Sequence, residues 1–141
     1  MKTLDNLVRL HDWQVDERRR ALAALEQLGR DLRVQVTRLD TELAAERRVA
    51  AEAPPGHVNF PAYAAAIGAR RAVLEQSIAD VDRQVEEARE EVSQAFRELK
   101  KYEHVRAGKK HRIRVKALRR AQTVLDEVAI NMYRRRVRAQ G

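Results

Sequence analysis

Few residues of the chain are of types that do chemistry, and their spacing argues against most enzyme classes. Gly108 and Lys109 look like part of a phosphate-binding loop, but such a loop needs glycine at 103 and serine or threonine at 110, where the chain has Glu103 and Lys110. His104 and His111 are seven residues apart and could share a helix face, but no pattern of carboxylates completes a metal site with them. The chain has no cysteine, which excludes disulfides, thiolate zinc sites and a cysteine nucleophile. We therefore expect no catalytic residue, no bound metal and no cofactor.

The composition is typical of long helices packed side by side. Of the 141 residues, 35% are charged and only 4% are aromatic, so the chain cannot fill a thick globular core. No uncharged stretch is long and apolar enough to span a bilayer. The first residues carry an acid where a signal peptide would need an apolar run. The sequence therefore predicts a cytosolic, all-α protein.

Apolar residues recur at alternating spacings of four and three from Leu4 to Ala50, which is a heptad pattern. The interruptions are His11, Arg18, Gly29 and Glu46. A second seam of the same kind runs from Ile67 to Tyr102. Because a coiled-coil partner covers only one narrow stripe of a helix, each seam is expected to face another helix.

The three prolines, at 54, 55 and 61, separate the two seams. Proline interrupts a helix but suits its first turn. The pattern predicts one unit over 1–141: helix one at about 4–52, a turn at about 53–60, and a longer helix two at about 61–138. The expected fold is an antiparallel coiled-coil hairpin.

The register of this hairpin can be predicted by laying the seams against each other. The best alignment places Leu43 opposite Leu74, Leu32 opposite Val85, Gly29 opposite Ala88, and Val15 opposite Tyr102. It puts Arg18 beside Glu98 and centres the turn between Val58 and Asn59. In this register the N-terminus of helix one lies beside residue 113 of helix two, and the residues of helix two beyond 113 have no partner.

The unpartnered end is basic and carries an apolar stripe. The net charge of the chain is +8, yet residues 97–141 alone carry fifteen Lys and Arg against four acids. Either these charges form a solvated helix face or, as expected here, they bind an anionic partner. The residues predicted to bind it are Lys109, Lys110, Arg112, Leu118, Leu125, Val128, Met132 and Arg134. A coiled-coil protein that binds nucleic acid through this segment is the alternative.

Two stretches resemble a known family. Residues 96–103 (FRELKKYE) are similar to the aromatic, lysine-rich stretch in the second helix of the FliJ proteins of bacterial flagellar export, and residues 125–133 (LDEVAINMY) are similar to that family's C-terminal ending. The resemblance implies a non-enzymatic protein shaped like the gamma stalk of rotary ATPases. Its implied partners are the hexameric flagellar export ATPase, the membrane export gate protein and export chaperones, with no nucleic acid. Injectisome stalk proteins have the same architecture.

The resemblance also implies a cytoplasmic monomer or weak dimer, peripherally associated with the export apparatus at the inner membrane. Phe60, Tyr63 and Ile67 lie beside the predicted turn. Under the resemblance they form a surface that docks on the export gate. The other interpretation is that they pack on one another and staple the turn.

Overall fold

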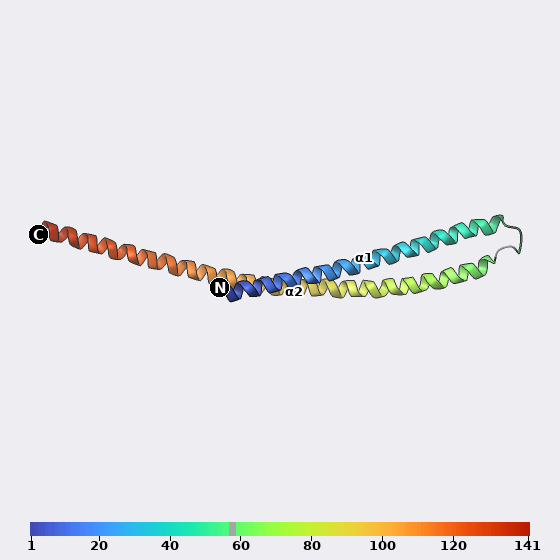
Figure 1. The fold of residues 1–141 in the computed structure, drawn as a ribbon, viewed down its shortest axis with the longest axis horizontal. Helices are drawn as coiled ribbons and strands as arrows, with labels where there is room; N and C mark the ends of the chain where they lie inside the picture. The colour runs from blue at the N-terminus through green and yellow to red at the C-terminus, as the bar shows by residue number, and fades with distance from the viewer. Residues whose placement is uncertain (57–58) are drawn as a thin grey trace. The chain divides into compact units, whose positions relative to one another are not determined.

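A computed structural model describes residues 1–56 and 59–141, which form two helices joined by a loop (Figure 1). Helix α1 comprises Lys2–Glu52 and helix α2 comprises Phe60–Gln140, with 51 and 81 residues. The helices pack against each other, and the second is the longer. This confirms the predicted all-α fold, with each helix boundary within two residues of its predicted position. The predicted turn centre includes Val58, which lies outside the described residues.

Helix α2 begins at a capping asparagine. The backbone N–H of Ala62 donates a hydrogen bond to Asn59 Oδ1 at 3.3 Å, and the N–H of Tyr63 donates to the Asn59 carbonyl at 3.2 Å. An asparagine in this position satisfies a backbone donor that the first helical turn leaves unpaired. Pro61 lies in that turn, where its missing N–H costs nothing.

Helix α1 ends where the prolines begin. The N–H of Ala53 still donates to the Val49 carbonyl at 3.0 Å, and Pro54 follows at once. Gly56 has a φ of 90°, a conformation that residues with a Cβ rarely adopt. Two prolines and this glycine therefore turn the chain away from the axis of α1.

The chain divides into two compact units. The larger contains residues 13–96, and the smaller contains residues 1–12 and 97–141. In the larger unit α1 and α2 run antiparallel and bury seam side chains, namely Val15, Leu39, Ile67, Val81, Val85 and Ala88. In the smaller unit Val8 and Leu99, also seam positions, are buried. That the whole chain is a single unit stays a prediction.

The observed partners on α2 lie two to seven residues earlier than the predicted register places them, about half a heptad on average. The position of a Cβ on the buried Gly29 lies 3.6 Å from Val81 Cγ1, although the sequence placed Ala88 there. Arg18 pairs with Glu91 at 3.0 Å, where Glu98 was expected. These two partners are seven residues earlier in α2 than predicted. The His11 ring stacks on Tyr102, four residues earlier than predicted, and Arg33 pairs with Asp82, two residues earlier. The register prediction was wrong because apolar residues recur every three or four residues along each seam, so the apolar pattern also fits an alignment displaced by about half a heptad.

Charged residues beside the seam distinguish the two alignments. Arg33 Nη2 lies 2.9 Å from Asp82 Oδ1, and Arg89 Nη2 lies 4.0 Å from Glu26 Oε1. In the predicted register Arg33 would face Gln84 and Asp40 would face Ser77, so neither of their ion pairs would form. Each exposed pair contributes only ~0.2–1 kcal/mol, but several such pairs together favour the observed register.

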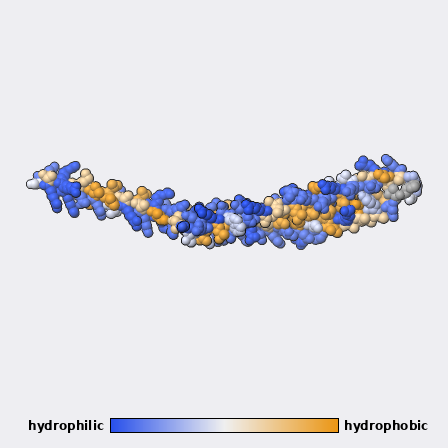
Figure 2. All heavy atoms as spheres, in the orientation of Figure 1, coloured by the Kyte–Doolittle hydropathy of each residue, from blue (hydrophilic) through white to orange (hydrophobic). Residues whose placement is uncertain are grey.

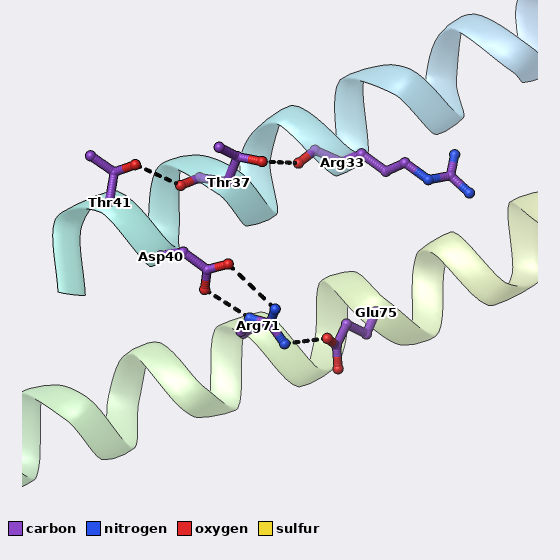
Figure 3. A network of polar contacts seen from close by, with 6 residues as sticks. All are labelled: Arg33, Thr37, Asp40, Thr41, Arg71 and Glu75. Carbon is purple, nitrogen blue, oxygen red and sulfur yellow. Dashed lines mark hydrogen bonds and ion pairs between the residues drawn. The ribbon is translucent and has the colours of Figure 1, made fainter. Parts of the chain in front are cut away.

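Arg71 joins the two helices near the middle of the larger unit. Its Nε donates to Asp40 Oδ1 at 2.8 Å and its Nη2 to Asp40 Oδ2 at 3.3 Å, while its Nη1 contacts Glu75 (Figure 3). The hydrogen bond to Asp40, and then the charge of Asp40, raise the pKa of Arg71 above its ordinary value. A forked guanidinium paired with a carboxylate through two bonds also fixes the alignment of the helices.

Candidate partner-binding surfaces

The paired part of α2 ends close to the N-terminus of α1. In the smaller unit, Asp5 Oδ1 lies 3.5 Å from Arg106 Nη1, and both side chains are partly buried. From residue 109 on, every described side chain except that of Val115 is exposed, and α2 continues beyond the N-terminus of α1 (Figure 1). We call residues 109–140 the C-terminal overhang. The shifted register makes it begin earlier than residue 113, and α2 is helical through Gly108.

The apolar stripe predicted for this overhang is present and open to solvent. Leu118 is 65% exposed, Leu125 62% and Met132 62%, and Val128 is exposed as well. At 3.6 residues per turn these four side chains share one face. Figure 2 shows the apolar residues interleaved with charged ones along this segment. Each such side chain gains ~1.5–3 kcal/mol when it is fully buried, so the stripe favours a partner.

A second apolar face on the overhang was missed at the sequence level. Ile130, Tyr133 and Val137 are all exposed, and they lie about a third of a turn around the helix from the first stripe. A heptad pattern identifies only one stripe of apolar residues on a helix, so it does not include a second apolar face that lies to one side of that stripe. The spacing of three and four residues within this set is the signal that would have found it.

The four predicted basic residues of the overhang, Lys109, Lys110, Arg112 and Arg134, are exposed. Residues 109–141 carry eleven Lys and Arg against Asp126 and Glu127. Both the charge and the apolar stripe predicted from the sequence therefore lie on the same uncovered helix.

The residues predicted at the turn end divide into two groups. Ile67 is 3% exposed and belongs to the seam of the larger unit, whereas Phe60 and Tyr63 are half-buried. The Arg47 guanidinium carbon lies 5.9 Å from the centre of the Phe60 ring, within the range of a cation–π contact. Ile67 and Phe60 thus hold the ends of the two helices together. A contact of Tyr63 and Phe60 with a partner stays a prediction.

A groove between the helices of the larger unit was not predicted. Leu39, Val73 and Leu74 line it, with Arg38 and Arg70 at its edges. Val73 is 67% exposed because it lies outside the heptad seam. Sequence periodicity gave no indication of it, because a single apolar residue off the seam is common on helix surfaces.

One seam position of the smaller unit is polar. The His11 ring stacks on the Tyr102 ring, with 4.3 Å between ring centres and 17° between ring planes. His11 Nδ1 is buried and has no hydrogen-bond partner. The sequence already placed His11 in the seam, and the stack explains how the apolar surroundings accommodate it.

Neither a metal-ligand cluster nor a membrane span is found among the described residues. No group of three or more His, Cys, Asp or Glu among them could hold a metal ion. None of the helices in this part of the chain meets the length and hydropathy needed to cross a membrane.

Comparison with known proteins identifies the family. A family model described as flagellar FliJ protein matches residues 1–138. The chain belongs to the FliJ family. The flagellar FliJ proteins of two Caulobacter vibrioides strains, NA1000 / CB15N and ATCC 19089 / CIP 103742 / CB 15, are each 31% identical to it over 100 residues, which cover 71% of this chain and 72% of the relative. No solved structure matches the chain significantly.

Membership of the FliJ family confirms the resemblance carried by residues 96–103 and 125–133. It makes the chain a component of the flagellar export apparatus and a non-enzymatic stalk protein. Because the match covers both helices and almost all of the overhang, the overhang belongs to the family's pattern.

Proposed function

We propose that this FliJ-family chain is a gamma-stalk-like adaptor of flagellar export. Its C-terminal overhang binds the ring of the hexameric export ATPase, and its turn end, with Phe60 and Tyr63, faces the membrane export gate. Export chaperones are further partners. The chain acts in the cytoplasm, peripherally associated with the export apparatus at the inner membrane, as a monomer or weak dimer.

The observation that carries this proposal is an overhang with apolar side chains on two faces and no covering helix. A single partner helix would bury one stripe and leave the other exposed. A second copy of the chain would also bring together two segments with eleven basic residues each, which repel one another. A partner that surrounds the helix and presents acidic groups fits both features, and the central opening of an ATPase ring is such a partner.

The test is a pair of matched double variants of the full chain. Leu125→Gln with Val128→Gln removes the centre of the apolar stripe. Val34→Gln with Val49→Gln removes two exposed apolar residues from α1 and serves as the control. We expect the first variant to lose binding and stimulation of the export ATPase, while both keep the helix content and melting temperature of the parent. Full stimulation by the first variant would contradict the proposal, as would stimulation by a chain truncated after Ala107.

The gate end has its own test. Tyr63→Ala should weaken binding of the export gate protein and leave the melting temperature unchanged, because Tyr63 is half-buried and lies outside the buried seam. Ile67→Ala should instead lower the melting temperature, because Ile67 is part of the core. A large fall in melting temperature for Tyr63→Ala would show that the tyrosine staples the turn.

A further inference from the structure

The basic residues of the overhang are concentrated at two levels. Residues 109–120 contain seven Lys and Arg and no acid, and residues 134–138 contain four Arg and no acid. We call these segments the first belt and the second belt. Between them, residues 121–133 carry only two charges, those of Asp126 and Glu127, together with most of the exposed apolar side chains. The sign of the charge therefore alternates along the helix as basic, acidic, basic.

Each belt is spread over more than half of the helix circumference instead of lining one side. Arg134, Arg135 and Arg136 are consecutive, so at 3.6 residues per turn they point in three directions about 100° apart. The seven basic residues of the first belt likewise occupy more than half of the circumference by the same geometry. All of these side chains are exposed. A groove of duplex DNA, a bilayer surface or a single helix would contact one side only.

The belts are far enough apart to be separate contacts. Their centres are roughly 20 residues from each other, which is ~30 Å along an α-helix. That distance exceeds the Debye length of about 8 Å at physiological ionic strength. Charges facing one belt therefore have little effect at the other.

We propose that the overhang is held at two separate levels by two acidic collars of a surrounding protein partner, with a neutral or basic, largely apolar lining between them. This rests on the proposed function, in which the partner is the export ATPase ring. The two-collar proposal adds the charge pattern that the partner must present. It also states that the second belt, like the first, contacts an acidic collar. Asp126 and Glu127 fix the axial position, because sliding the helix would bring them against an acidic collar.

Three triple variants of the full chain test the inference, and each removes three positive charges. Arg112→Gln, Arg114→Gln and Lys116→Gln weaken the first belt. Arg134→Gln, Arg135→Gln and Arg136→Gln weaken the second belt. The control replaces Arg9, Arg19 and Arg48, which are exposed on α1, by Gln. Glutamine keeps a good helix propensity, so helix content should be unchanged. Affinity for the purified export ATPase of the same organism is measured between about 50 and 300 mM salt, a range over which screening changes strongly.

We expect each belt variant to bind about tenfold more weakly at low salt and to lose part of the salt dependence, because rim charges act through screened electrostatic attraction. The control should bind like the parent. Unchanged affinity and salt dependence of either belt variant would overturn the inference. The proposed function would still stand in that case if the Leu125→Gln, Val128→Gln variant fails to bind the ATPase. If that apolar variant binds fully, the proposed function fails first. Nucleic acid is the other possible occupant. The two-collar inference would also be overturned if the parent binds a 20-base-pair duplex tightly at 150 mM salt and both belt variants lose this binding but keep ATPase binding.

Discussion

Arg18 of α1 and Glu91 of α2 form an ion pair across the hairpin, with 3.0 Å between Nη1 and Oε2. The pair sets Arg18, a charged residue in an otherwise apolar seam, against an acid that lies seven residues before the one expected from the apolar pattern. Together with the Arg33–Asp82 and Asp40–Arg71 pairs, it defines the register of the larger unit. That register decides where α1 stops covering α2, and so where the overhang begins.

Cysteine cross-linking tests this register directly, because the chain has no cysteine of its own. Leu32→Cys with Val81→Cys places the two thiols at one level of the observed hairpin, in the register of the His11–Tyr102 stack, so an intrachain disulfide should form readily under mild oxidation. Leu32→Cys with Val85→Cys displaces them by about four residues along the axis, ~6 Å, which together with the separation of the helices exceeds the reach of a disulfide. Gel mobility under non-reducing conditions measures both. Efficient cross-linking of the second pair instead would show that the helices adopt the predicted register.

Charge reversal at Asp82 tests what selects the register. Asp82→Arg places a guanidinium against Arg33 and should destabilise the hairpin by ~0.5–1 kcal/mol at low salt, with a smaller loss in high salt, because both side chains are 54% exposed and screened. Combining it with Arg33→Asp restores the opposite charges and should recover most of the loss. Urea unfolding followed by circular dichroism gives the free energies. If the double variant is no more stable than the single one, this pair does not contribute to the register.

These contacts also show how much of the molecule the sequence could predict. Helix boundaries followed from Asn59, the prolines and the seams, because capping and helix breaking are local. The register did not, because the apolar seam is periodic and only the side chains flanking it, such as Arg33 and Asp82, differ between alignments. The overhang was predicted, since any register leaves α2 longer. The face with Tyr133 and the groove at Val73 were not, because they lie outside the heptad positions.

His11 provides a test of the polar interruption in the seam. His11→Leu removes a buried nitrogen that has no hydrogen-bond partner, and it places an apolar side chain at a seam position. We therefore expect the free energy of unfolding to rise by about 1 kcal/mol. The measurement is the melting temperature at pH 7.5. His11→Phe keeps an aromatic ring against Tyr102 and serves as the comparison. A lower melting temperature for His11→Leu with an unchanged one for His11→Phe would mean that ring stacking outweighs the cost of the unpaired nitrogen.

The overhang should be the first part of the isolated protein to be cut by trypsin. A lone helix gains little stability without packing, and it opens locally far more often than the paired helices. Its eleven Lys and Arg are exposed sites, so early cleavage should fall within 109–138 and leave a resistant product containing α1 and residues 60–108 of α2. Mass spectrometry of the digest over time identifies the cuts. Early cleavage in α1 would contradict this order of stability.

Gly108→Ala supplies the matched variant for this digestion. A Cβ at Gly108 meets no atom within 4 Å, so alanine fits without strain. It favours the helix by about 1 kcal/mol relative to glycine, which corresponds to roughly fivefold in a local opening equilibrium. Cleavage just after the substitution, at Lys109 and Lys110, should therefore slow by up to about fivefold, while cleavage at Arg134 and beyond should not change, because fraying at the C-terminus does not require opening at Gly108. Equal slowing at both places would show that the overhang opens as one cooperative unit.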